Sequence, residues 1–220
     1  MDFKQLLSYI LPINIFQIKS EINQNLEVTW NNGRLVLDSK NTNFSFGSLE
    51  RVMNVGLKKI GKETIASYQS VLVLGVGGGS VLKLLQDEFQ FTRKIIGIEL
   101  DPKVIAIANR YFGLDKRNNI EIYNTDAEIF VKETSLTFDL IVIDIFQDKK
   151  MPDFLFSAPF INDLSQILSK KGSILFNSIV TLSTEFERNK DYHNLVSSYF
   201  SSVQKLIKVE GDNELFILRK

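Results

Sequence analysis

The chain has 220 residues, of which 44% are hydrophobic and 24% charged, ordinary proportions for a globular protein with a substantial core. Its 26 basic and 26 acidic residues balance, so no general positive field favours nucleic acid, and no such partner is expected. Cysteine is absent, which excludes disulfides, cysteine nucleophiles and thiolate metal sites and fits a cytoplasmic location.

No apolar run reaches the roughly 18 residues of a membrane span, so no membrane partner is expected. The apolar N-terminus carries Asp2 and lacks a basic flank, and we expect it to be folded structure and not a signal peptide.

Residues 1–68 are expected to form an N-terminal extension, a β-hairpin followed by a helix. Two β-rich runs, 26–30 and 34–37, flank residues 31–33, Asn-Asn-Gly, and Asn-Gly between two such runs predicts a hairpin turn. Apolar residues at helical spacing predict a helix over 48–60.

Strands and helices alternate in the second predicted domain, residues 69–220. Strands are expected at 70–75, 94–99, 119–123, 138–144 and 172–180. Helices are expected between them at 80–88, 102–111, 127–134 and 158–169, and a further one near 185–199. Two closing β-rich runs, 203–209 and 214–218, predict a C-terminal antiparallel hairpin. The predicted fold is therefore α/β, a doubly wound sheet with helices on both faces.

A glycine cluster separates the first strand and helix of this domain. It consists of Gly75, Gly77, Gly78 and Gly79, and Glu99 ends the next strand 20 residues later (99 − 79). Strand, glycine turn, helix, strand and acid form the layout of a nucleoside-binding unit, in which glycines allow close approach of a ligand and the acid accepts hydrogen bonds from two ribose hydroxyls. The loop fits G-x-G-x-G, which is typical of S-adenosylmethionine sites; Ser80 interrupts the dinucleotide pattern G-x-G-x-x-G.

The chain resembles the spermidine synthase branch of the class I S-adenosylmethionine-dependent methyltransferases. The motifs that carry the resemblance are Val71–Leu82, Ile98–Asp101, Asn124–Glu128 and Ile141–Asp144, together with the N-terminal hairpin and helix. The resemblance implies a Rossmann-like seven-stranded sheet with its last strand antiparallel, a homodimer, and S-adenosylmethionine or its decarboxylated form as cofactor. It also implies that Glu99 binds the ribose, that Asp126 binds the adenine amino group, and that Asp144 lies where donor and acceptor meet.

Two positions differ from the aminopropyltransferases of that branch. Those enzymes resemble G-G-G-D-G-G in the loop, where the Asp helps hold the donor amine, and this chain has Gly78 there. They also resemble D-x-x-D-P after the fourth strand, where both acids serve a diamine; here Gln147 takes the second place, and Asp148 comes one residue late. Because two ammonium groups need carboxylate partners, methyl transfer to a small acceptor is the preferred prediction. Aminopropyl transfer and a catalytically degenerate nucleoside-binding or interaction domain are the alternatives.

Each acid also has a plain structural interpretation. Glu99 could be a solvated strand end, although the glycine loop favours ribose binding. Asp126 could cap the following helix, bind adenine, or do both. Asp144 ends an apolar strand at the edge where open α/β sheets bind ligands, which favours a role as a base or as a counter-ion for a sulfonium. Asp101, before Pro102, predicts a helix cap rather than a ligand contact.

Two further features point more to structure than to chemistry. The sole histidine, His193, lies in a polar predicted helix and is expected at the surface; without cysteine or a histidine cluster, no metal site is predicted. An aromatic stretch, Phe146, Phe154, Phe156 and Phe160, is more typical of core or dimer surface, although it directly follows Asp144 and could cover an acceptor.

Overall fold

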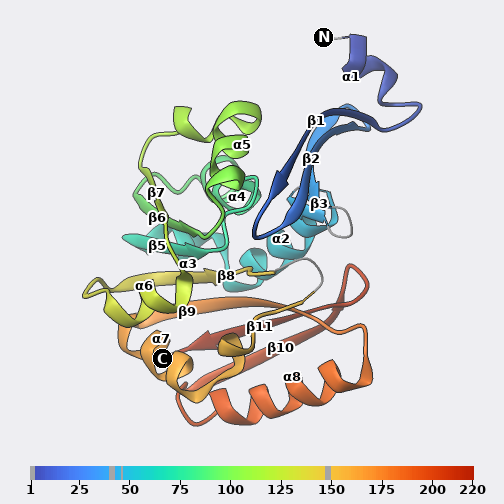
Figure 1. The fold of residues 1–220 in the computed structure, drawn as a ribbon. Helices are drawn as coiled ribbons and strands as arrows, with labels where there is room; N and C mark the ends of the chain where they lie inside the picture. Colours follow the sequence, from blue (N-terminus) through green and yellow to red (C-terminus); the bar gives the residue numbers. More distant parts are fainter. Residues whose placement is uncertain (1–2, 40–42, 46, 147–149) are drawn as a thin grey trace.

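The computed structural model describes residues 3–39, 43–45, 47–146 and 150–220 (Figure 1). Its centre is a seven-stranded sheet in the order β10-β11-β9-β8-β5-β6-β7. Five strands are parallel: β5 (Ser70–Leu74), β6 (Lys94–Glu99), β7 (Ile120–Asn124), β8 (Phe138–Ile143) and β9 (Leu168–Ile179). The order changes direction between β5 and β8, and open α/β sheets bind ligands at such a point.

The C-terminal hairpin completes the sheet. β10 (Ser202–Val209) and β11 (Asn213–Arg219) pair with each other, and β11 lies between β10 and β9, antiparallel to both. The predicted seven-stranded sheet with an antiparallel last strand is therefore confirmed.

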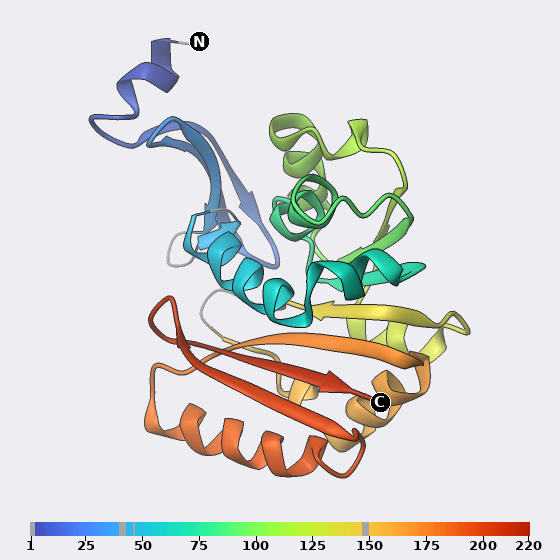
Figure 2. The ribbon, with the colours of Figure 1, turned by 180° about the vertical axis from the view of Figure 1, so that it is seen from behind.

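Helices cover both faces of this sheet because the central strands are apolar on both sides. In β5, Val71 and Val73 pack under one group of helices, and Leu72 and Leu74 pack under the other. The first group is α2 (Ser48–Ile60), α3 (Lys62–Ser67), α4 (Ser80–Asp87) and α5 (Pro102–Phe112). The second group is α6 (Ala127–Glu133), α7 (Ala158–Ile167) and α8 (Ser183–Val196). Figure 2 shows α2 and α8 on opposite sides of the sheet.

The N-terminal extension is larger than the predicted hairpin. Four antiparallel strands form its sheet: β1 (Ile13–Ser20), β2 (Gln24–Asn31), β3 (Arg34–Ser39) and β4 (Asn43–Ser45). A short helix, α1 (Phe3–Leu7), precedes them. The predicted turn is confirmed, since Asn32 and Gly33 both have positive φ (49° and 75°), as a two-residue type I′ hairpin requires. One face of the sheet packs against α5 through Val104, Ile107 and Phe112.

The boundary between α7 and β9 differs from the prediction. The helix expected to run to residue 169 ends at Ile167, and β9 begins at Leu168 instead of residue 172. The register of β9 against β8 shifts between the pairs Phe138–Leu168 and Leu140–Ser173. This irregular start, which contains Lys171 and Gly172, resembles a helix end in sequence.

Candidate functional site

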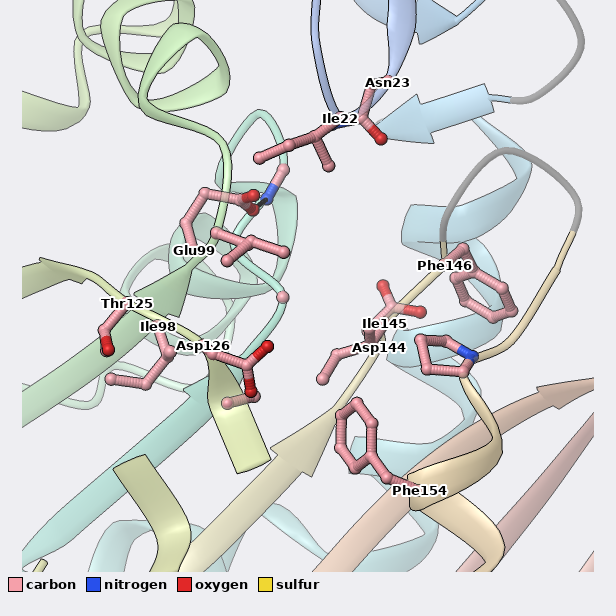
Figure 3. Close-up of a pocket in the computed structure, with 15 residues that line it drawn as sticks. Ile22, Asn23, Ile98, Glu99, Thr125, Asp126, Asp144, Ile145, Phe146 and Phe154 are labelled. Carbon is pink, nitrogen blue, oxygen red and sulfur yellow. Dashed lines mark hydrogen bonds between the residues drawn. The ribbon is translucent and has the colours of Figure 1, made fainter. Parts of the chain in front are cut away.

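A pocket opens at the carboxyl ends of β5, β6 and β8, with an empty space of about 700 Å³ including the part open to solvent (Figure 3). Five of the seven predicted site residues line it: Gly75, Gly77, Glu99, Asp126 and Asp144. The other two, Gly78 and Gly79, lie in the same loop, and Gly79 precedes the first residue of α4. The structure therefore brings together residues that are up to 69 positions apart in the sequence (144 − 75).

The glycine loop needs glycine at three of its four positions. Gly75, Gly77 and Gly79 have φ values of 86°, 53° and 85°, in the left-handed region that side chains disfavour. Gly75 has a second reason, because an added Cβ would lie 2.2 Å from the carbonyl oxygen of Asp144. Gly78 does not share the left-handed conformation, so its backbone is compatible with a side chain. The pattern G-x-G-x-G thus matches the backbone requirement position by position.

Glu99 is a buried anchor for this loop and not a solvated strand end. Its Oε2 accepts hydrogen bonds from the N–H groups of Val76 (3.2 Å) and Gly77 (3.0 Å), and its Oε1 accepts one from the N–H of Asp101 (3.0 Å). Burial raises the pKa of the Glu99 carboxyl, while these N–H donors favour its charged form. Since a carboxylate offers about four acceptor positions, three of them already serve the backbone. Ribose binding by Glu99 stays a prediction, with room for fewer direct hydroxyl contacts than the two expected.

Asp101 caps α5 as predicted, and its side chain also forms hydrogen bonds with the β1–β2 turn of the N-terminal sheet. Its Oδ1 accepts a hydrogen bond from the N–H of Lys103 (2.9 Å), and its Oδ2 accepts from the Ser20 hydroxyl and from Asn23 Nδ2 (2.9 Å for the amide). These contacts hold the β1–β2 turn over the pocket, where Ile22 and Asn23 contribute to its wall (Figure 3). Sequence reasoning missed this wall because it did not predict β1.

Asp126 caps α6, as one of its two interpretations predicted. Its Oδ1 accepts hydrogen bonds from the N–H groups of Glu128 (2.7 Å) and Ile129 (3.4 Å). The residue also lines the pocket beside Thr125, so capping leaves it beside any bound ligand. Its predicted contact with adenine remains a prediction.

Asp144 begins the loop that follows β8. Its N–H donates to the Leu74 carbonyl (2.9 Å), and its Oδ1 accepts a hydrogen bond from Asn177 Nδ2 (3.0 Å). Burial raises the pKa of the Asp144 carboxyl to about 6, and the Asn177 donor opposes that rise. Figure 3 shows the carboxylate directed into the pocket, near Phe146 and Phe154. Gln147 and Asp148, which bear on the diamine question, lie outside the described residues.

The aromatic stretch divides between pocket and core. Phe146 and Phe154 line the pocket, as a cover for an acceptor would. Phe160 is buried in the core with its ring edge-on to Phe154, 4.9 Å between centroids. Phe156 packs against Phe176 and Tyr192.

Three of the sequence predictions concern features other than this pocket: His193, a metal site and a membrane span. His193 is half-buried on α8 and takes no part in the pocket wall. Within the described ranges, no three histidine or acidic side chains gather as a metal site would need. In the same part of the chain, every helix is too short or too polar to cross a bilayer.

The Asp144 pKa predicts how ligand affinity changes with pH. A sulfonium beside Asp144 favours the charged carboxylate. The affinity of the protein for a sulfonium ligand should therefore fall as pH drops through about 6 and Asp144 becomes protonated. We expect S-adenosylmethionine to bind about tenfold more weakly at pH 5 than at pH 7. The affinity for S-adenosylhomocysteine, which has a neutral thioether, should change less with pH. This ligand also controls for any effect of Glu99 on affinity, because Glu99 would contact both ligands in the same way. Calorimetric titration at both pH values measures this; equal pH dependence for the two ligands would contradict a sulfonium beside Asp144.

Comparison with protein families identifies the chain from its sequence. The model of the spermine/spermidine synthase domain matches residues 50–209, which include the glycine loop and all the acids of the pocket. The chain belongs to this family. The predicted resemblance to the spermidine synthase branch is therefore confirmed.

Individual relatives match about half of the chain. A polyamine aminopropyltransferase of Vibrio vulnificus is 27% identical over 136 residues, which are 60% of this chain and 45% of that protein. One of Thermoplasma volcanium is 34% identical over 50% of this chain and 41% of that protein. An eEF1A lysine and N-terminal methyltransferase of Xenopus laevis is 26% identical over 50% of this chain and 17% of that protein. Each match covers less than half of the relative's length.

Solved structures agree on the fold. A spermidine synthase in complex with the transition-state analogue AdoDATO superposes with a TM-score of 0.74 at 18% identity, over 94% of this chain and 73% of that one. Human methyltransferase-like protein 13 in complex with SAH gives 0.68 at 20% identity, over 79% of this chain and 82% of that one. At these identities the superpositions establish the fold alone.

Proposed function

We propose that this protein transfers an aminopropyl group from decarboxylated S-adenosylmethionine to a small amine, with Asp144 as the base. The observation that carries the proposal is the pocket itself, where the glycine loop, Glu99 and Asp126 surround space beside a partly buried acid with a raised pKa. The names of the relatives support aminopropyl transfer better than methyl transfer, which the sequence analysis placed first.

The residues of the pocket suit an in-line displacement. The glycine loop and Glu99 would hold the nucleoside, and Ile22, Phe146 and Phe154 would exclude water from the reacting centre. As an acceptor amine forms its new C–N bond, the S–C bond breaks and sulfur keeps the electron pair. Asp144 receives the proton that the amine loses, and a carboxyl with a pKa near 6 is suited to that role near neutral pH.

Methyl transfer is a second candidate because of Gly78. A decarboxylated donor brings an aminopropyl cation, and Gly78 offers it no carboxylate. The by-product distinguishes the two reactions: 5′-methylthioadenosine marks aminopropyl transfer, and S-adenosylhomocysteine marks methyl transfer. Incubation with each donor and a panel of amines, followed by mass spectrometry, tests the proposal. Absence of both by-products, with no binding of either donor, would contradict it and leave the degenerate-domain alternative.

Replacing Gly78 with Asp should strengthen binding of the decarboxylated donor. The backbone at Gly78 is compatible with a side chain, and a carboxylate there would pair with the donor's ammonium group. We expect about a tenfold lower KM for that donor. Gly78→Asn, which has the same shape without the charge, is the control and should leave KM nearly unchanged. Equal effects of Asp and Asn would show that the donor amine lies elsewhere.

A further inference from the structure

Two asparagine amides, one buried and one half-buried, form a line behind Asp144. Asn177 lies on β9, its side chain is fully buried, and its Nδ2 donates to Asp144 Oδ1 over 3.0 Å. Asn213, the first residue of β11, donates from its Nδ2 to Asn177 Oδ1 over 2.9 Å. The line thus runs from the start of β11, through the carboxyl-terminal part of β9, to the acid at the pocket.

Asn177 is a polar residue that follows an apolar, fully buried part of β9. The preceding residues of β9, Leu175 and Phe176, are fully buried and apolar. An amide in such a place costs folding free energy unless both of its ends are hydrogen-bonded. Here its donor end reaches Asp144 and its acceptor end reaches Asn213.

We propose that Asn177 and Asn213 are positioning residues, which hold the Asp144 carboxylate in one orientation so that its second oxygen faces the acceptor. This inference rests on the proposed function, since it assigns Asp144 its working geometry. Asn177 engages Oδ1, and Oδ2 is then the atom expected to receive the proton of the incoming nucleophile.

The order of donors and acceptors in this line favours the charged acid. Asn213 presents its NH₂ group to Asn177 Oδ1, so the NH₂ group of Asn177 faces Asp144. An NH₂ donor stabilises a carboxylate and cannot accept a hydrogen bond from the O–H of a neutral carboxyl. The reverse order would place Asn177 Oδ1 against Asp144, which only the protonated acid can accommodate.

No basic side chain lines the described pocket to pair with Asp144. The other titratable side chains that line it are Glu99 from β6 and Asp126 from the start of α6, and both are acids. The glycine loop approaches Asp144 with its backbone at Gly75. From β9, the side-chain amide of Asn177 reaches the Asp144 carboxylate. In the described part of the chain, Asn177 is thus the group that opposes the effect of burial on Asp144.

The experiment follows the Asp144 carboxyl directly, by ¹³C NMR of Asp-labelled, ligand-free protein titrated with acid. Asp144→Asn assigns the signal. In Asn177→Leu, which keeps the size of the side chain but removes the donor, we expect the Asp144 pKa to rise by about one pH unit. Asn213→Ala should raise it by less, because it frees Asn177 to rotate without removing it.

Asn189→Leu is the matched control. Asn189 is equally buried and bonds to Ser178 (2.8 Å) and Glu214 (2.8 Å), but not to Asp144. The Asn189→Leu variant should have a lower unfolding temperature and an unchanged Asp144 pKa. If Asn177→Leu does not fold, the half-buried Asn213→Ala carries the test; an Asp144 pKa unchanged in every folded variant of the pair overturns the proposal.

The titration needs no donor, so the two proposals can fail separately. A shifted pKa in protein that transfers no group would leave the amide line standing and contradict the proposed function. Once turnover is measured, the acidic limb of the pH profile of kcat should move upward in Asn177→Leu and stay in place in Asn189→Leu.

Discussion

Asp144→Asn is expected to fold normally and to lose turnover by about 10²–10⁴-fold, the range for removal of a general base. The amide keeps the size of the acid, and its oxygen still accepts the hydrogen bond from Asn177. Donor affinity should fall by much less than turnover if Asp144 acts on the acceptor, and by a comparable factor if it serves only as counter-ion to the sulfonium. Calorimetric affinity and single-turnover rate, measured on the same two proteins, separate these roles.

The same variant has an expected effect on stability. The pKa of Asp144 in the folded protein, about 6, lies above its ordinary value of 3.8, so the folded state resists ionisation. Ionisation therefore destabilises the fold as pH rises from about 4 to 6, and the penalty is fully present at pH 7. Asp144→Asn should then be at least as stable as wild type at pH 7, and this excess should disappear at pH 4. Denaturant unfolding at both values measures it.

Asp139 provides a matched control on the same strand. It lies at the opposite end of β8, away from the pocket, where its carboxylate accepts hydrogen bonds from the Gln69 N–H (2.7 Å) and the Ser169 hydroxyl (2.6 Å). Asp139→Asn should lower stability and leave turnover within about twofold of wild type. A fully active Asp144→Asn protein would show that the acid has no catalytic role.

The central sheet could be predicted because its signals are local. β5 is a short apolar run before a glycine loop, and Asp101-Pro102 marks the start of α5 within two residues. The predicted acids also line the same pocket, because parallel strands present their carboxyl ends at the same edge of the sheet. What the sequence did not indicate were contacts between distant segments, such as Asn23 and Ser20 with Asp101, or Asn177 with Asp144.

The missed residues share a physical cause. An asparagine in a strand or turn has no periodicity or motif, and its importance depends on which partner the fold places 33 or 78 residues away. β1 alternates weakly between exposed and half-buried positions, and none of its residues before Ser20 is fully buried, so its strand signal was weak. The preference for methyl transfer came from two positions, Gly78 and Gln147, whereas the family relationship extends over residues 50–209.

Gly77→Val is expected to abolish binding of every S-adenosyl ligand, with a loss of at least about a hundredfold in affinity. Gly77 lines the pocket, has a φ of 53°, and donates its N–H to the Glu99 carboxylate. A branched side chain there would occupy ligand space and strain the backbone by about 1–2 kcal/mol. NAD should bind to neither protein, and wild-type affinity for NAD above that for all S-adenosyl ligands would contradict the site assignment.

Gly113→Val separates loss of the site from loss of stability. Gly113 follows the last residue of α5 with a φ of 65°, and an added Cβ would meet only the Lys116 side chain, 4.0 Å away. The substitution therefore imposes a similar backbone strain outside the pocket. Both variants should lower the free energy of unfolding by a similar amount, and Gly113→Val should keep wild-type affinity for S-adenosylmethionine. Equal losses of affinity in the two variants would mean that global destabilisation, and not the position of Gly77 against the ligand, explains the effect.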